Sequence, residues 1–355
     1  MNEQAIQYVG LDVHQATTVA SVRDERGRVV MHATVPTEAR ALLALIRGLS
    51  GRVEVAFEEG TQAQWLHDLL VPHAARVVVC NVRGHGEKAN KNDQLDADDL
   101  SERLRLGSLK AVWHGSPAVG TLKELVRCYD NLVDDSTRVM LRLKAIYRGR
   151  AIGTSGKSVY RPSQRKAWLA KLKTRGARTR AESLLTQLDT LTTLRHAART
   201  AMIAEARRQP GWKILRSMPF FGPVRVAMLL AVIGTPHRFR TRRQLWPYVG
   251  LSVVTRTSGE GEFVDGKLQR KQRAPLTRGL NANHNRMLKN VFKGAANAAA
   301  AKSGPLKDLF DRCVAGGVRP TMAKLTLARK LAAIVLRLWK KGELWDPEKL
   351  TMQPT

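Results

Sequence analysis

Residues 7–22, which read QYVGLDVHQATTVASV, hold two short runs rich in β-branched and apolar side chains. The first run covers residues 7–13 and the second covers residues 17–22. A third run, residues 29–35, follows the turn-like sequence Asp24-Glu25-Arg26-Gly27. Runs of this length, separated by polar turns, are typical of neighbouring strands. The start of the chain therefore predicts an antiparallel meander of three strands.

Helical and extended patterns alternate after the meander. Apolar residues recur at helical spacing in residues 37–49, 62–70 and 96–106, and short β-branched runs occupy residues 52–57 and 76–79. A meander followed by alternating helices and strands predicts an α/β domain with one mixed sheet and flanking helices.

The rest of the chain has a largely helical pattern. Residues 117–150 and 182–208 repeat apolar residues at helical spacing, which predicts two long antiparallel helices, a helical hairpin or coiled coil. The basic segment between them contains glycines and Pro162, so we expect a loop or insertion shaped by its ligand rather than a packed core. The final third predicts a small, mainly helical domain. We place the domains at residues 1–112, 113–210 and 211–345, with a tail at 346–355.

Charge is distributed unevenly along the chain. The 355 residues carry 60 Lys and Arg against 30 Asp and Glu, a formal charge of +30. Residues 1–106 contain 15 acidic and 12 basic side chains, a net of −3, so the remainder carries +33. Residues 138–180 and 266–307 contain no acidic residue at all. Such stretches favour a polyanion, and nucleic acid is the expected partner.

Cysteine usage and hydropathy indicate a cytoplasmic protein. Cys80, Cys128 and Cys313 lie far apart, and none belongs to a CxxC pair, so we expect neither a disulfide framework nor a zinc site. The first residues lack the pattern of a secretion signal, and no apolar run approaches the roughly 18 residues that span a bilayer. We therefore expect no membrane partner.

Carboxylates in the first third follow a pattern that suggests chemistry. Asp12 ends the first predicted strand and Glu58 ends another, while Asp93 and Asp96 project from one face at the start of a helix. Converging carboxylates repel one another unless cations share them, and Mg²⁺ prefers oxygen ligands. Two such ions about 4 Å apart can polarise a phosphodiester. These four acids are therefore our predicted catalytic and metal-binding residues.

Each acid also has a structural interpretation. Asp93 and Asp96 favour a helix N-terminus through capping and the helix dipole, and a lone Asp at a strand end commonly forms a turn. The combination of these acids in an acidic part of a basic protein is what favours catalysis.

Two further features point to contact with phosphate. The turn at residues 218–223, MPFFGP, lies between two short predicted helices and either aims backbone N–H groups at a phosphate or simply breaks a helix. The basic stretches supply candidate contacts with an RNA or DNA backbone. These are Arg161, Arg165, Lys166, Lys171, Lys173, Arg270, Lys271 and Arg273.

Several motifs together resemble one group of insertion-sequence transposases, the bridge-RNA-guided serine recombinases of the insertion-sequence one-hundred-and-ten family. Four motifs resemble that family's DEDD, RuvC-like domain, and three resemble its C-terminal transposase domain. The first four are GLDVH at residues 10–14, FEEGT at 57–61, VVVCN at 77–81 and KNDQLDA at 91–97. The last three are MPFFGP at 218–223, YVGL at 248–251 and SG at 258–259.

The resemblance implies an RNase H-like sheet, a long helical hairpin and a small helical domain that supplies a serine nucleophile. Asp12, Glu58, Asp93 and Asp96 would hold two Mg²⁺ ions, with Mn²⁺ as an alternative, and Ser258 would form the phosphoserine. The second acid of Glu58-Glu59 is an alternative ligand. Donor and target DNA, a structured guide RNA and dimers that pair into tetramers follow from the family, as does a bacterial, nucleoid-associated location.

Three functions fit these expectations to different degrees. The first is a Mg²⁺-dependent DNA transposase or recombinase that works through a phosphoserine intermediate. The second is a RuvC-like, junction-resolving endonuclease that activates water at the same acids, for which Ser258 would be dispensable. The third is a non-catalytic nucleic-acid-binding protein in which the acids only cap helices.

Overall fold

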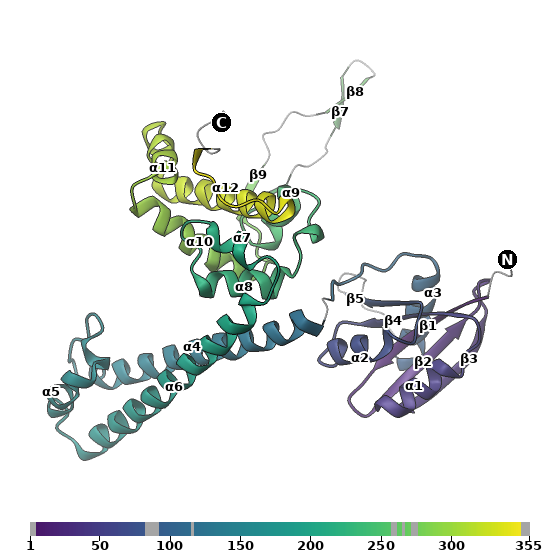
Figure 1. Cartoon of the computed structure of the whole chain (residues 1–355), viewed down its shortest axis with the longest axis horizontal. Coiled ribbons are helices and arrows are strands. Elements are labelled where there is room, and N and C mark those ends of the chain that lie inside the picture. The colour runs from purple at the N-terminus through teal and green to yellow at the C-terminus, as the bar shows by residue number, and fades with distance from the viewer. Residues whose placement is uncertain are drawn as a thin grey trace. The chain divides into compact units, whose positions relative to one another are not determined.

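The computed structural model describes residues 5–81, 92–114, 117–256, 261–264, 267–270 and 276–348. The chain divides into two compact units, Met1–Pro117 and Ala118–Thr355, which are described one at a time. Figure 1 labels the helices and strands of both.

A five-stranded mixed sheet forms the centre of the first unit, in the order β3-β2-β1-β4-β5. Strand β1 pairs antiparallel with β2, which pairs antiparallel with β3, and β4 and β5 continue the sheet in parallel with β1. This arrangement confirms the predicted meander and mixed sheet, and it is compatible with an RNase H-like domain. The strands are β1 (Ile6–Val13), β2 (Thr17–Arg23), β3 (Val29–Pro36), β4 (Arg52–Glu58) and β5 (Arg76–Cys80).

Helices cover both faces of this sheet. Helices α1 (Ala39–Arg47) and α2 (Ala63–Leu70) pack on one face, where Leu11 and Phe57 lie fully buried among their side chains. Helix α3 (Asp93–Arg105) covers the other face and contacts β1, β2 and β4. It begins earlier than the predicted start at Asp96.

The close approach of α3 to β1 depends on Gly10. A Cβ atom at this position would lie 2.2 Å from the carbonyl oxygen of Ala97 and 2.5 Å from the backbone nitrogen of Ser101. Both atoms belong to the backbone of α3. Glycine therefore allows the helix to rest directly on the strand that carries Asp12.

The second unit opens with two long helices, α4 (Pro117–Arg148) and α6 (Arg175–Arg207), as the helical spacing predicted. Helix α6 begins well before the predicted start at Glu182. The basic segment between them contains η1 (Ser158–Tyr160), η2 (Pro162–Gln164) and α5 (Arg165–Ala170).

The interpretation of this basic segment as a loop without a packed core was wrong. Val159, Trp168 and Leu172 are buried against Tyr147 of α4 and Leu185 of α6, in a hydrophobic cluster of their own. The Trp168 and Tyr147 rings meet edge to face, with centroids 5.2 Å apart. A few apolar anchors are therefore enough to fold the segment, since its cations can remain at the surface.

The last part of the second unit is mainly helical and shares one hydrophobic core with the start of α4 and the end of α6. Its helices are α7 (Trp212–Ser217), α8 (Pro223–Ile233), η3 (Pro236–Arg238), α9 (Arg242–Tyr248), α10 (Arg286–Ala301), α11 (Pro305–Ala315) and α12 (Pro320–Lys341). Four short strands that the sequence did not predict lie between α9 and α10. They are β6 (Val253–Arg256), β7 (Gly261–Val264), β8 (Lys267–Arg270) and β9 (Leu276–Leu280). Among the helices that the structure describes, none combines the length and apolar character that crossing a membrane requires.

Candidate metal centre

Asp12 and Glu58 lie next to each other at the ends of adjacent parallel strands. Leu11 of β1 is paired with Phe57 of β4, and both side chains are buried on the face that α1 and α2 cover. Because side chains alternate along a strand, the next residue in each strand projects to the α3 face. The backbone N–H of Glu59 still donates to the Cys80 carbonyl of β5, at 2.8 Å, so the alternation continues and directs Glu59 to the other face. The geometry thus favours Glu58 over Glu59.

Asp93 reaches the same place from helix α3. The side chain of Asn92 caps this helix by accepting a hydrogen bond from the backbone N–H of Gln94, at 3.1 Å. Asp93 and Asp96 stand in the first turn. Because Asn92 caps the helix, the only structural role left to the two acids is their favourable interaction with the helix dipole.

An imidazole joins the acids of the strand and the helix. Nε2 of His14 lies 3.1 Å from Oδ2 of Asp12 and 3.4 Å from Oδ2 of Asp93. One ligand atom of each residue falls within 4.8 Å of the others. His14 stands in the GLDVH motif, and the motif alone predicted no role for it. Its position two residues after a strand-end Asp was the available signal, because alternate residues of an extended chain share a face.

Electrostatics tie Asp96 to the same group. Burial raises the pKa of Asp12 above its ordinary 3.8, His14 opposes that rise, and the charges of Asp93 and Asp96 add to it. Ionising Asp12 therefore costs more free energy in the folded protein than in a free aspartate. A cation bound among these oxygens would offset both the burial and the repulsion.

The donor chemistry of the group fits a divalent ion. Asp12, Glu58, Asp93 and Asp96 offer carboxylate oxygens, the donors that Mg²⁺ prefers. The imidazole of His14 adds a nitrogen that Mn²⁺ or another first-row ion accepts more readily than Mg²⁺ does. Glu58 also lines a pocket of about 620 Å³ at this end of the sheet, together with His14 and Gln62.

Other acids of α3 are engaged within the fold. Oδ1 of Asp98 accepts a hydrogen bond from the Ser21 hydroxyl at 2.5 Å and lies 2.8 Å from Nε2 of His32. Asp99 forms an ion pair with Arg103 at 3.1 Å. These contacts distinguish the structural acids of α3 from Asp93 in its first turn.

Two family models match this chain. A family model described as a transposase, the DEDD transposase of IS110, matches residues 9–149. A second, described as the transposase IS116/IS110/IS902 family, matches residues 212–310. The chain belongs to the IS110 family of insertion-sequence transposases. It is also 25% identical to the insertion element IS116 uncharacterized 44.8 kDa protein of Streptomyces clavuligerus, over 96% of each chain.

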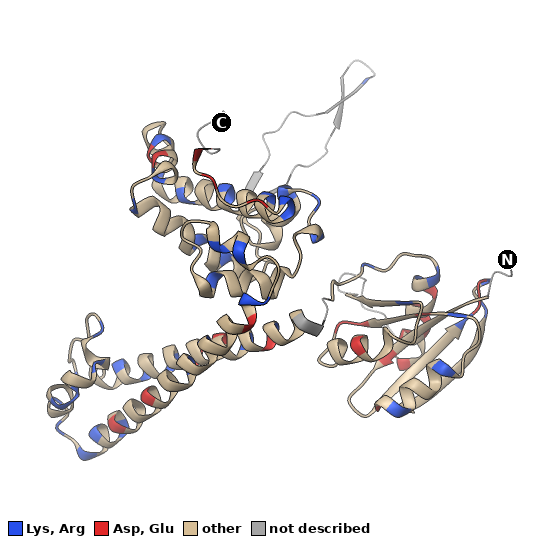
Figure 2. Ribbon diagram, in the orientation of Figure 1, with Lys and Arg blue, Asp and Glu red and all other residues tan. Residues whose placement is uncertain are grey.

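The predicted nucleophile of this transposase, Ser258, lies outside the described residues, as do Lys271 and Arg273. Arg270 belongs to β8, and nothing is described of its side chain. Of the predicted site residues, the structure brings Asp12 and Asp93 together around His14, with Glu58 at the end of the neighbouring strand and Asp96 in the same helical turn as Asp93. Figure 2 shows the acidic residues of that unit in red.

The basic candidates of the second unit fall into two groups. Arg161, Lys166, Lys171 and Lys173 are exposed, and Figure 2 shows the basic residues around α5 in blue. Arg165 instead forms a two-pronged ion pair with Asp189 of α6, with one contact at 2.6 Å. Arg165 thus helps to fix the basic segment to α6.

The turn at residues 218–223 is held by two arginines of the transposase. Nη1 of Arg216 donates to the carbonyl of Phe221 at 2.5 Å, and Nη1 of Arg225 donates to the carbonyl of Phe220 at 2.6 Å. Phe220 has a φ of 67°, in the region that favours glycine. These contacts explain the turn as part of the fold, and the phosphate contact stays a prediction.

Proposed function

We propose that this transposase cuts and rejoins DNA strands by phosphoryl transfer at the end of its N-terminal sheet, where Asp12, Glu58, Asp93 and Asp96 hold two Mg²⁺ ions. The observation that carries the proposal is the meeting of Asp12 and Asp93 around Nε2 of His14, with Glu58 in register beside Asp12. Bound ions would polarise the phosphodiester and stabilise the attacking and leaving oxygens.

Ser258 would supply the nucleophile, as the family resemblance implies. Its Oγ forms a bond to phosphorus, its proton passes to solvent or a nearby base, and the displaced strand-end oxygen takes up a proton. The phosphoserine conserves the phosphodiester for a second attack, in which the hydroxyl of another strand end displaces the serine. Ser258 is followed by Gly259, and the wide range of backbone conformations open to glycine suits a hydroxyl that must reach a site in a partner protomer.

Nucleic acid and assembly complete the proposal. Donor and target DNA would bind together with a structured guide RNA, and dimers would pair into tetramers in the bacterial cytoplasm. The strong positive charge of the chain supports polyanion binding, because lysine and arginine contacts with phosphate release counterions. We propose that the domain at residues 1–112 holds the metal ions and that the domain at 211–345 supplies the nucleophile. The helical hairpin at residues 113–210 connects these two domains along the chain.

A denaturation-resistant adduct between protein and DNA would test the mechanism. Purified protein would be incubated with the flanking DNA of its element, candidate guide RNA and Mg²⁺, then resolved under denaturing conditions. Wild-type protein should form the adduct, and Asp12→Asn and Ser258→Ala should not. Asp24→Asn is the matched control, because Asp24 pairs with Arg28 in a turn of the same unit.

The same experiment separates the rival functions. A nuclease that activates water would still cut DNA as Ser258→Ala, without an adduct. A non-catalytic binder would cut nothing in any variant and would not respond to Mg²⁺. An undiminished adduct in Ser258→Ala would reject Ser258 as the nucleophile.

A further inference from the structure

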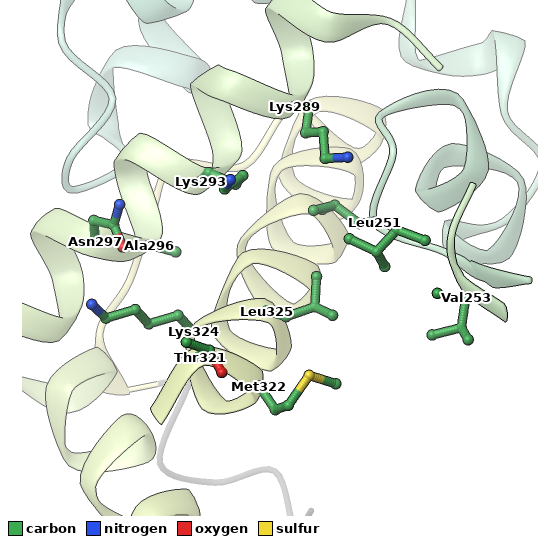
Figure 3. Close-up of a pocket in the computed structure, with 12 residues that line it drawn as sticks. Leu251, Val253, Lys289, Lys293, Ala296, Asn297, Thr321, Met322, Lys324 and Leu325 are labelled. Carbon is green, nitrogen blue, oxygen red and sulfur yellow. The ribbon is translucent and has the colours of Figure 1, made fainter. Parts of the chain in front are cut away.

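An apolar pocket with a basic rim lies in the second unit (Figure 3). Its volume is about 680 Å³, within the range of small-molecule and nucleotide sites. Leu251 and Leu325 form its floor with Ala296 of α10, and Met322 of α12 forms a wall with 47% of its surface exposed. The pocket is open and largely preformed by packed helices.

Three lysines surround this apolar floor. Lys289 and Lys293 project from successive turns of α10, and Lys324 projects from α12 (Figure 3). No acidic side chain lines the pocket, and within the described ranges none of the three lysines forms an ion pair. Three unneutralised ammonium groups at the rim of one pocket favour an anionic ligand.

We propose that this pocket binds one unstacked nucleotide of single-stranded DNA. The base would lie against Leu251, Leu325 and Met322, since a flipped base is held between apolar side chains in such pockets. The phosphates on either side would contact the lysines. The amide of Asn297 and the hydroxyl of Thr321, which also line the pocket, can donate and accept hydrogen bonds at a base edge.

The choice of DNA rests on the proposed function. Strand β6 begins at Val253, which lines the pocket, and ends at Arg256, shortly before Ser258 in the sequence. A strand held in the pocket would therefore be held by the part of the chain that leads into the nucleophile. An apolar helix of another protein would leave the three lysines without partners unless it also carried acids. Single-stranded DNA therefore fits the pocket better than such a helix does.

Binding measurements in EDTA would test the pocket without involving cleavage. A fluorescein-labelled 20-mer of single-stranded DNA would be titrated by anisotropy with wild-type protein, Lys293→Ala plus Lys324→Ala, and Thr321→Trp. The double variant should lose on the order of ten-fold in affinity, and the bulky side chain of Thr321→Trp a similar factor. Lys302→Ala, an exposed lysine at the end of α10 that does not line the pocket, should change affinity little.

A crosslinking measurement reports the site directly and does not depend on the variants. Single-stranded DNA that contains 5-iodouracil would be irradiated with wild-type protein, and the labelled peptide would be sequenced. The peptide should include Met322. Thermal unfolding of each variant shows whether a loss of affinity reflects loss of fold.

Several outcomes would overturn the proposal. Wild-type affinity in both pocket variants would exclude the pocket as a DNA site, and so would crosslinks confined to other peptides. The pocket variants could also lose as much affinity for an RNA 20-mer as for the DNA 20-mer, or more. That result would reject DNA as the source of the nucleotide. A change of oligomeric state with unchanged DNA affinity would identify a second copy of the chain as the occupant. None of these results bears on Asp12→Asn, so failure here and failure of the proposed function are separate.

Discussion

Replacing Gly10 by alanine tests whether the position of α3 determines metal binding. The new Cβ would meet the Ala97 carbonyl oxygen at 2.2 Å and the Ser101 nitrogen at 2.5 Å, and Cβ atoms essentially never approach other heavy atoms within 3.0 Å. Both obstacles are helix backbone, which cannot rotate away as a side chain can. Helix α3 must therefore move off the sheet.

This movement has two expected consequences. Overpacking of this kind costs about 1–3 kcal/mol, so the melting temperature of the metal-free protein should fall by several degrees. Asp93 and Asp96 move with α3, whereas Asp12 stays on β1. Because metal–ligand distances are held to about 0.2 Å, a helix displaced by more than that should weaken Mn²⁺ binding by roughly ten-fold or more.

Calorimetric titration with Mn²⁺ and thermal unfolding in EDTA would measure both effects. Gly176→Ala is the matched control, because a Cβ at this position in α6 meets nothing within 4 Å. The control should bind Mn²⁺ as wild type does. Wild-type Mn²⁺ affinity in Gly10→Ala, with a lowered melting temperature, would show that α3 does not position the metal ligands.

Three further predictions concern charge and burial. In EDTA, Asp12→Asn should raise the melting temperature near neutral pH. Burial raises the pKa of Asp12 above 3.8, so wild-type protein loses stability as pH rises through the raised pKa, and the asparagine variant does not. The difference between the two proteins should vanish at pH 3, where Asp12 is protonated. Burial raises the pKa of Cys80 to about 11, so iodoacetamide at pH 8 should label exposed Cys128 and spare Cys80, as mass spectrometry of the native protein would show. Arg165→Met should lower the free energy of unfolding by only about 0.5–1 kcal/mol, because its partner Asp189 is more than half exposed. It should also speed limited proteolysis of residues 149–174. Unchanged cleavage would mean that the apolar cluster alone holds the segment.

Short β-branched runs separated by polar turns made the N-terminal sheet predictable from the sequence. Residues 7–13 and 17–22 carry the β-branched runs, and the turn at Asp24 to Gly27 gives the antiparallel connection. Because side chains alternate along a strand, Asp12 and Glu58 lie on one face once their strands are adjacent. Which strands are adjacent is a long-range property, and only the pairing of Leu11 with Phe57 favours Glu58 over Glu59 as the neighbour of Asp12.

The basic segment shows where its glycines and Pro162 misled the prediction. These residues suggested a loop or insertion shaped by its ligand rather than a packed core. In the structure Trp168 and Leu172 are buried, while Lys171 lies over the Trp168 ring with its ammonium 3.9 Å from the centroid. Long basic side chains can cover apolar surface and still reach solvent, so high charge did not preclude a small core.

The position of His14 two residues after Asp12 indicated a shared face, but its contact with Asp93 could not be predicted from the strand pattern. His14 follows β1, and its backbone N–H donates to the carbonyl of Thr17 at 3.0 Å within the turn to β2. This turn sets the direction of the His14 side chain, and the start of α3 sets the direction of the Asp93 side chain. Two segments distant in sequence therefore decide the contact, and neither carries a local signal for it.

The acids of the first unit differ in how well the protein itself stabilises their charge. Burial disfavours the charged form of Asp98, yet hydrogen bonds from Ser21 and His32 outweigh it and lower the pKa of Asp98 below 3.8. For Asp12 the balance is opposite, because burial and the charges of Asp93 and Asp96 outweigh the contact with His14. A fold that optimised stability alone would not retain that repulsion. The acids that the protein leaves poorly compensated are the ones at which a bound divalent cation contributes most, and this is the physical reason to place the metal there rather than among the other acids of α3.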